Sequence, residues 1–458
     1  MINTGINQEK TALILVALGA FLIPFMGSSL NIALPSIGDD LTGSLILLGW
    51  LPTVFVLANA AFLLPFGKLA DIHGRKRIFT YGVVIYTAAS LLAALSPTIQ
   101  FLILGSFLQG LGCALIFATG TALLSSVYPT NHRGAAFGFF ITAVYLGLFL
   151  GPLLGGFLVQ NLGWRSIFLF NVPLGLILLT LIFWRFKGEW TGAPGVKFDL
   201  IGSAIYIPSL TALLYGFTDL ANSVGQMIFI AGVVGFIIFL WRERVFPDPI
   251  LRLEDLLKRV SASSALALLF INISTTAMWT LLSLYFQDLL GLEPQITALI
   301  ISVEPLMVAL LSPVVGRLSD QRENRIFTVS GMLVTTTGLL ILSTLNLTTP
   351  LPITILGLVL VGVGIALFSP PTTNTFMGSM KQANYGMASA TLSTMIYAGQ
   401  TLSLGILLFI ISGFMGNVQV TPANYHLFLS SLNIAFLIFA TFSGLGVIIS
   451  LFMSKKAD

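Results

Sequence analysis

Long apolar segments recur along the whole chain, and this pattern constrains the fold more than any other feature. Short polar or Gly/Pro-rich breaks separate the segments. A helix of about 20 apolar residues crosses a bilayer, and these segments reach or approach that length. The expected spans are residues 11–35, 45–66, 78–96, 100–126, 135–160, 166–186, 200–220, 226–241, 262–287, 295–316, 326–346, 351–374, 386–413 and 427–453. The sequence therefore predicts an all-α integral membrane protein with about fourteen transmembrane helices.

The composition excludes an ordinary soluble protein. Charged residues make up 8% of the 458 residues and hydrophobic residues 56%, whereas a soluble domain has about 25% charged residues. So few charges cannot cover a water-facing surface, and exposed apolar surface on that scale causes aggregation. Lipid is therefore the expected solvent for most of the surface.

The basic residues fall on one side of the predicted membrane. If the N-terminus is inside, Arg165 is the only one of the 21 Lys and Arg residues that falls outside. The outer loops instead contain the acidic residues Asp39, Asp40, Asp219, Asp288 and Glu293. Because Lys and Arg favour cytoplasmic loops, we expect a multi-pass protein of the cytoplasmic (inner) membrane with both termini in the cytoplasm.

One loop motif occurs twice. Residues 67–77 read GKLADIHGRKR and residues 316–325 read GRLSDQRENR, so that Gly67 and Asp71 match Gly316 and Asp320. Both copies follow an apolar span on the predicted cytoplasmic side. A motif that recurs at matching places in two halves indicates a duplicated helical bundle.

The first copy of this motif resembles the loop signature of the major facilitator superfamily, and the second resembles its degenerate repeat. The number of spans resembles the fourteen-helix drug/proton antiporter group of that family. Further matching patterns are Asn31–Pro35, Trp50–Thr53, Trp164–Phe168, Asn171–Gly175 and the fifth-span motif formed by Gly147, Gly151, Pro152, Gly155 and Gly156. The resemblance implies a six-helix bundle in residues 1–190, two additional helices in 191–256 and a second six-helix bundle in 257–458.

The resemblance also implies a cytoplasmic gate, in which Asp71 pairs with Arg75 or with a neighbouring helix terminus. The gating residues would be Gly67, Asp71, Gly74, Arg75, Gly316 and Asp320. A charge pair at a helix end can form and break as bundles rock. The alternative is that these charges only set the membrane topology.

The glycines of the fifth span recur every four residues and so share one helix face. Small residues allow close helix packing, and Pro152 permits a kink. We expect this face, with Gly147, Gly151 and Gly155, to lie at the interface between the bundles. The alternative is tight packing without a mechanistic role.

Glu304 is the one ionisable side chain well inside a predicted span. A carboxylate there is costly unless it faces a cavity, finds partners or is protonated. Glu304 is therefore the candidate proton carrier or binder of cationic ligands, with a structural glutamate as the alternative. The antiporters resembled usually have an Asp at the place of Met26 and an Arg at the place of Ser106. The energy coupling is therefore open.

Polar and aromatic residues inside spans are the candidates for the substrate pathway, since few such groups can face lipid. They are Asn31, Asn59, Gln109, Tyr145, Asn272, Trp279, Asn374, Tyr397 and Gln400. For any one of them a hydrogen bond between helices is an equal alternative.

The expected function is secondary active transport, with proton-coupled efflux of drugs or amphipathic small molecules as the leading hypothesis. A facilitator or symporter for a small metabolite or lipid-like molecule is the alternative, followed by a sensor or a membrane-embedded enzyme. No Gly-x-x-x-x-Gly-Lys-Ser/Thr pattern for ATP is present. The one cysteine and three histidines favour neither metal nor cofactor. The expected partners are a small-molecule substrate, protons and the bilayer, without nucleic acid, and the expected state is a monomer.

Overall fold

The fold of this chain is helical throughout its described part. The computed structural model describes residues 2–41, 45–220, 222–416 and 424–453. Within these residues, 14 helical segments are long and apolar enough to cross a membrane. They coincide with the spans predicted from the sequence, which confirms the count of fourteen and the all-α class.

The first eight spans are single helices. They are α1 (Ile2–Leu41), α2 (Leu45–His73), α3 (Arg75–Ala94), α4 (Ile99–Val127), α5 (Arg133–Leu162), α6 (Arg165–Trp184), α7 (Leu200–Thr218) and α8 (Ser223–Val245). A short helix α9 (Leu253–Leu256) follows. The remaining helices are α10 (Arg259–Leu284), which continues as the π-helical turn η2 (Tyr285–Leu289), α11 (Pro294–Ile301), α12 (Val303–Ser319), α13 (Asn324–Leu342), α14 (Leu351–Ser379), α15 (Tyr385–Met415) and α16 (Tyr425–Ser450).

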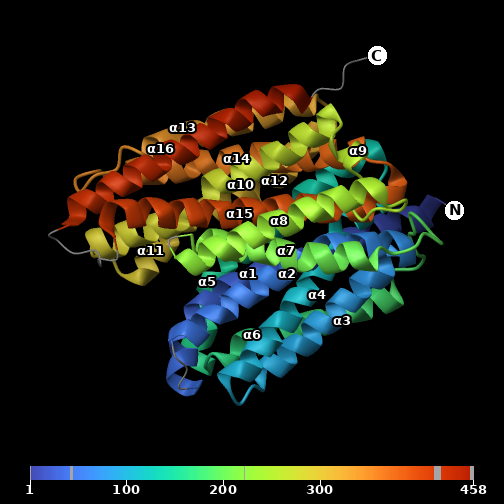
Figure 1. Ribbon diagram of the computed structural model, residues 1–458, viewed down its shortest axis with the longest axis horizontal. Helices are drawn as coiled ribbons and strands as arrows, with labels where there is room; N and C mark the ends of the chain where they lie inside the picture. Colours follow the sequence, from blue (N-terminus) through green and yellow to red (C-terminus); the bar gives the residue numbers. More distant parts are fainter. Residues whose placement is uncertain (1, 42–44, 221, 417–423, 454–458) are drawn as a thin grey trace.

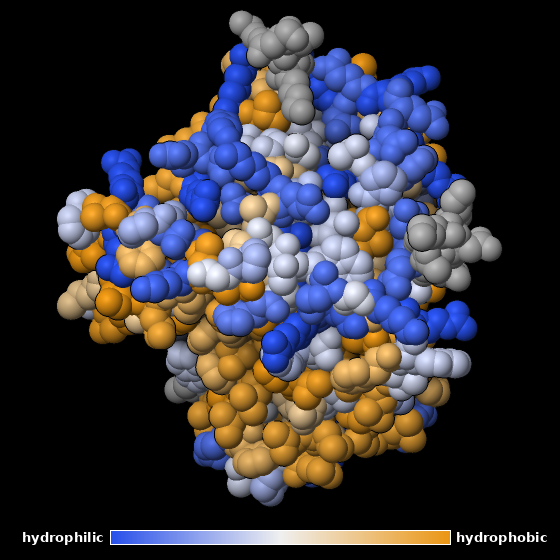
Figure 2. Space-filling view, turned by 90° about the vertical axis from the view of Figure 1, so that its right-hand side faces the viewer, coloured by the Kyte–Doolittle hydropathy of each residue, from blue (hydrophilic) through white to orange (hydrophobic). Residues whose placement is uncertain are grey.

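The helices run side by side along one long axis, and α1 begins and α16 ends at the same end of the molecule (Figure 1). The turns that contain the two loop motifs, between α2 and α3 and between α12 and α13, also lie there, and we refer to it as the motif end. Seen face-on, the motif end is covered by hydrophilic residues, while the flanks are apolar (Figure 2). This distribution suits a protein whose flanks face lipid and whose ends face water.

Helices α1 to α6 pack mainly against one another, as do α10 to α16. The closest packing between these two groups joins α5 to α12 and α2 and α4 to α15. Helix α7 packs against α8 and also touches both α2 and α15. Helix α8 lies on the outside. Only 17% of its most apolar 18-residue stretch is buried, compared with 61% for the same length of α4.

One predicted span is interrupted at Ser302, which separates α11 from α12. Pro305 has no backbone N–H to donate to the carbonyl of Ile301, so one helical hydrogen bond is missing there. The next N–H, of Leu306, again bonds the carbonyl of Ser302 at 3.1 Å. The interruption places Glu304 in the first turn of α12.

The connection between α6 and α7 folds over the motif end, and we refer to residues 186–193 as the strap. The carboxylate of Glu189 accepts the backbone N–H groups of Lys76 and Arg77 at 2.9 and 3.0 Å, and so caps α3. The strap residues Gly192 and Ala193 donate their N–H groups to the carbonyl of Asp71 at 2.9 and 2.8 Å. The strap is therefore held by the first loop motif.

Candidate functional site

Asp71 joins the two groups of helices at the motif end. Its carboxylate accepts the N–H groups of Gly386 and Met387, the second and third residues of α15, at 2.7 and 2.9 Å. Arg75 donates to the same carboxylate from Nε at 3.1 Å and from Nη2 at 2.7 Å. Arg75 also reaches the carbonyl of Gln382 at 2.5 Å, across the same interface. Because Asp71 and Arg75 are only 2% and 1% exposed, these contacts form a buried latch on a helix N-terminus.

Asp320 makes the equivalent contact in the second half. Its carboxylate accepts the N–H groups of Gly134 and Ala135, at the start of α5, at 2.7 and 2.9 Å. No arginine bonds Asp320 among the described residues. Burial raises the pKa of Asp320, and the backbone N–H groups of Ala135 and Gly134 offset that rise only in part. The second latch therefore repeats the two backbone contacts of the first without an arginine on the carboxylate.

Glycines bring the backbones together at both latches. A Cβ on Gly67 would lie 2.5 Å from the carbonyl oxygen of Gly386, and a Cβ on Gly134 would lie 2.5 Å from that of Gly316. These separations are too short for any side chain. Of the gate residues that the resemblance implied, Gly67, Asp71 and Arg75 thus contact the start of α15 or the turn before it, and Gly316 and Asp320 contact the start of α5. Gly74 instead lies against Glu189 of the strap.

A cavity of about 340 Å³ lies between the two groups of helices, farther along the helix axes than the latches. On α15 its lining begins at Leu392, which lies roughly 9 Å beyond Gly386 at about 1.5 Å per residue, and extends to Gln400. Aromatic side chains line much of its wall, namely Phe55, Phe117, Phe140, Tyr145, Trp279 and Tyr397. No Lys, Arg, Asp or Glu is among the described residues that line it.

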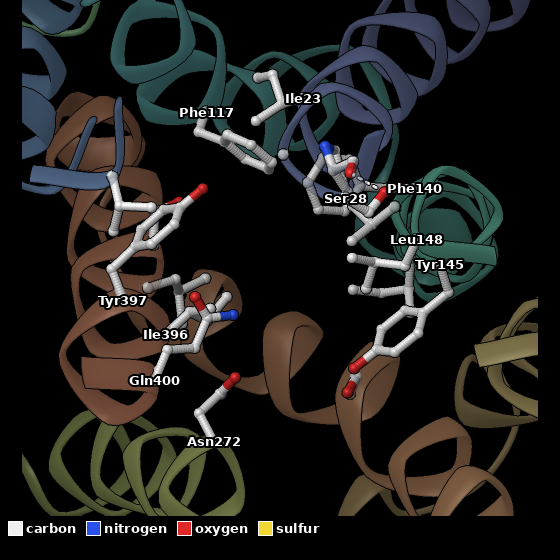
Figure 3. A pocket seen from close by; sticks show the side chains of 18 of the residues that line it. Ile23, Ser28, Phe117, Phe140, Tyr145, Leu148, Asn272, Ile396, Tyr397 and Gln400 are labelled. Atoms are coloured by element: carbon white, nitrogen blue, oxygen red, sulfur yellow. Dashed lines mark hydrogen bonds between the residues drawn. The ribbon is translucent and has the colours of Figure 1, made fainter. Parts of the chain in front are cut away.

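The polar groups of the cavity face one another across it (Figure 3). Tyr397, Gln400 and Asn272 point in from α15 and α10, and Ser28 and Tyr145 approach from α1 and α5 on the opposite side. Neutral donors and acceptors on an apolar wall suit an amphipathic ligand, because they orient it without requiring a charge.

The structure separates the predicted pathway residues into two sets. Those that line the cavity are Asn31, Tyr145, Asn272, Trp279, Tyr397 and Gln400. Asn59 lies behind the wall and donates to the Tyr397 hydroxyl at 2.6 Å. Gln109 is buried within the first group of helices, where it donates to Ser90 at 2.8 Å. Asn374 lies in a different depression at the motif end, beside Asn324 and Arg325. Gln109 and Asn374 are therefore not at the cavity.

Glu304 lies directly behind the cavity wall and is 1% exposed. Its Oε2 accepts the indole N–H of Trp279 at 3.2 Å, and the Trp279 side chain itself lines the cavity. The phenol of Tyr145 is within electrostatic range of the carboxyl group. The carboxyl group of Glu304 is thus one side chain away from the substrate-sized space.

The glycine face of α5 lies against α1 rather than between the two groups of helices. A Cβ on Gly147 would lie 2.5 Å from the carbonyl oxygen of Phe21, and one on Gly155 would lie 2.7 Å from Ser29 Cβ. A Cβ on Gly151 would overlap the Ser28 hydroxyl. The prediction that these three glycines face the other bundle is therefore wrong. They instead fix α1 beside the cavity.

The two other residues of the fifth-span motif make looser contacts. A Cβ on Gly156 would lie 4.0 Å from Ile32, an ordinary contact distance. Pro152 lies inside α5, where it removes one backbone donor. Neither residue is a close contact of the kind seen at Gly151.

Met26 and Ser106 do not face the cavity. The Met26 sulfur accepts the Asn171 amide at 3.3 Å inside the first group of helices. Ser106 is fully buried, and its hydroxyl has no hydrogen-bond partner among the described residues. No charged group replaces the two missing charges at these positions.

Several lining residues escaped the sequence analysis because their types are common in any membrane helix. Phe117 and Phe140 form an edge-to-face pair with centroids 6.3 Å apart, and Phe117 makes a similar pair with Tyr397 at 6.4 Å. Ser28 and Thr121 add hydroxyl groups. Only a known three-dimensional packing distinguishes these residues from the many others of the same type.

A membrane protein with a substrate-sized cavity between two groups of helices, which duplicated carboxylate contacts join at one end, has the construction of a membrane transporter. The chain belongs to the major facilitator superfamily, whose family model matches residues 16–404. It is a transporter rather than an enzyme.

Relatives with described roles are similar over most of the chain. The "Riboflavin transporter RibZ" of Clostridioides difficile is 27% identical over 99% of both chains. The "Multidrug resistance protein Stp" of Mycobacterium tuberculosis is 31% identical over 88% of this chain and 75% of its own length. The crystal structure of the human organic anion transporter MFSD10 matches 96% of this chain and 99% of its own with a TM-score of 0.70. At 14% sequence identity, that structural match supports the fold alone.

Proposed function

We propose that this transporter exports aromatic, amphipathic small molecules in exchange for protons, and that Glu304 carries the proton. The observation that carries the proposal is the aromatic cavity, whose described lining is uncharged, with one buried carboxyl group directly behind Trp279. The wall favours flat apolar ligands with a few polar groups. The carboxyl group gives the site one position at which a proton can be held and released.

We further propose that the chain lies in the cytoplasmic membrane as a monomer, with the motif end in the cytoplasm. The concentration of Lys and Arg in the loops of that end supports this orientation. The conformation described here would then be closed to the cytoplasm. The proposed division is a bundle of residues 1–190, two additional helices in 191–256 and a bundle of residues 257–458, which the packing preferences of the helices support.

A facilitator or symporter for a flavin-like metabolite is the second candidate. It is favoured by the end-to-end similarity to a protein named a riboflavin transporter. It is also favoured by Met26 and Ser106, which replace charged groups of the antiporters that the chain resembles. A facilitator would move its substrate down the concentration gradient of that substrate, and a symporter would move it in the same direction as protons. An antiporter moves its substrate in the opposite direction to protons.

Flux into proteoliposomes with an imposed pH gradient tests the proposal. Two fluorescent aromatic probes suffice, riboflavin (uncharged) and ethidium (cationic). We expect a proton gradient to drive at least one probe in the opposite direction, and Glu304→Gln to abolish that drive. The matched control is Glu293→Gln, because Glu293 is exposed at the other end of the protein, just before α11. Gradient-driven exchange that persists in Glu304→Gln would refute the assigned role of Glu304.

A further inference from the structure

Trp279 contacts the cavity and the buried carboxyl group at the same time. Its ring forms part of the cavity wall, and its Nε1 donates to Glu304 Oε2 at 3.2 Å. The two residues come from different spans, since Trp279 is near the end of α10 and Glu304 is in the first turn of α12. Whatever fixes the position of the indole therefore also fixes a hydrogen bond to Glu304.

The surroundings of Glu304 contain few other polar groups. Helix α5 contributes the Tyr145 phenol, and α14 contributes the small residue Gly362, whose Cβ position is 2.6 Å from the Glu304 carbonyl oxygen. Helices α5, α10 and α13 carry charged residues only close to their starts, at Arg133, Arg259 and Arg325, and α14 carries none. The continuation of α10 in η2 adds Asp288, nine residues or roughly 14 Å beyond Trp279. The indole N–H is therefore the main partner through which the charge of Glu304 can be stabilised.

An indole N–H can only donate. It bonds a carboxylate about twice as strongly as a neutral carboxylic acid, because the bond to the charged acceptor is charge-assisted. A ligand that stacks on the Trp279 ring holds the indole in the orientation that makes this bond. Stacking in the cavity and ionisation of Glu304 should therefore favour each other.

We propose that Trp279 is the positioning residue that couples the binding of an aromatic substrate to the release of the proton from Glu304. The proton passes from the carboxyl group to water in the cavity, while the indole keeps its own N–H throughout. This inference rests on the proposed function, since it takes Glu304 as the proton carrier. Linkage requires the effect to be mutual, so a proton on Glu304 weakens substrate binding by the same factor. We expect a factor of about five, equivalent to about 1 kcal/mol at 1.4 kcal/mol per tenfold.

Equilibrium binding of riboflavin to the purified full-length protein in lipid nanodiscs, at about pH 6 and about pH 8.5, tests the coupling. We expect the wild type to bind about fivefold more tightly at the higher pH. Trp279→Phe keeps an aromatic ring and loses the N–H, so its affinity should be independent of pH. Trp164→Phe is the matched control, because Trp164 donates its indole N–H to Asp40 at 3.0 Å at the other end of the protein. It should retain the fivefold ratio.

The infrared C=O band of protonated Glu304, identified by its absence in Glu304→Gln, gives a second readout that needs no substrate. In Trp279→Phe we expect Glu304 to bind its proton about fivefold more tightly than in the wild type. The band should therefore persist to a higher pH. This measurement decides the matter even if Trp279→Phe binds no riboflavin.

The outcomes distinguish the two proposals. If Glu304→Gln binds independently of pH while Trp279→Phe keeps the wild-type ratio and an unchanged band, the role of Trp279 is refuted and that of Glu304 stands. If Glu304→Gln itself keeps the pH dependence, the proton role of Glu304 is refuted, and the inference about Trp279 with it.

Discussion

Replacing Asp71 by asparagine is expected to open the motif end. The carboxylate accepts two N–H groups from α15, at Gly386 and Met387. Asparagine keeps one acceptor oxygen and turns an amide N–H₂ group toward the other backbone N–H, so one of the two bonds is lost and the other loses its charge assistance. Hydrogen bonds to charged groups contribute about 1.5–3 kcal/mol and neutral ones about 0.5–1.5 kcal/mol. The total loss across the interface is therefore about 3 kcal/mol.

A loss of this size changes the ratio of closed to open protein by about 100-fold, since 1.4 kcal/mol corresponds to a factor of ten. Electron–electron distance measurements between spin labels at His73→Cys and Lys381→Cys, in a Cys113→Ser background, report the separation at the motif end. Both labelled residues are exposed, on either side of the latch. We expect a second, longer distance to dominate in Asp71→Asn.

Asp39→Asn is the matched control, because Asp39 is exposed at the opposite end of α1 from the motif end. It should leave the distance distribution unchanged. The thermal stability of each variant is measured in parallel, so that unfolding is not mistaken for opening. A folded Asp71→Asn protein with only the short distance of the wild type would refute the reasoning that this carboxylate holds the latch.

Three further outcomes are expected. Gly151→Leu should abolish flux of the probe that the wild type transports without preventing membrane insertion, because its side chain overlaps the Ser28 hydroxyl and displaces α1. Gly156→Ala, which meets only an ordinary contact, should transport normally. Gly74→Ala should lower the free energy of unfolding by about 1–2 kcal/mol, measured in chemical denaturant, since its φ of +112° is unfavourable for a residue with a Cβ. Because the pKa of Asp320 is raised by burial in the closed state, its contact should be most stable below the ordinary pKa of about 3.9 and weaken as pH rises through the raised value. The yield of cross-links between α5 and α12, measured as a function of pH, should therefore fall as pH rises. In Asp320→Asn the yield should not depend on pH.

The sequence was sufficient to predict the spans, because each is apolar over its whole length and lipid requires such a segment. The resemblance of the repeated motif to the family's loop signature also implied that Asp71 pairs with Arg75 or with a helix terminus, and Asp71 makes both contacts. The sequence did not identify which helix termini Asp71 and Asp320 contact, since the groups that they bind are backbone N–H groups of α15 and α5. Backbone donors are present at every residue except proline and so leave no mark in a sequence.

The cavity was harder to predict, for a different physical reason. A helix such as α4 is apolar around its whole circumference, so its pattern does not show which side faces the protein interior. Gln109 and Gln400 are both glutamines within apolar spans, yet one bonds Ser90 in the core and the other lines the cavity. The orientation of the glycine face toward α1 was missed for the same reason, since spacing gives the face but not the partner.

The strap makes the two additional helices inseparable from the first latch. Glu189 caps α3, and a Cβ on Gly192 would overlap the carbonyl oxygen of Ala383 and lie 2.7 Å from Arg75 Nη2. A shortened chain made by cutting out residues 187–256 would thus lose more than a peripheral hairpin, since it would also leave the first turn of α3 uncapped. In this chain, removal of the α7–α8 pair therefore requires a new connection that again supplies an acceptor for the N–H groups of Lys76 and Arg77.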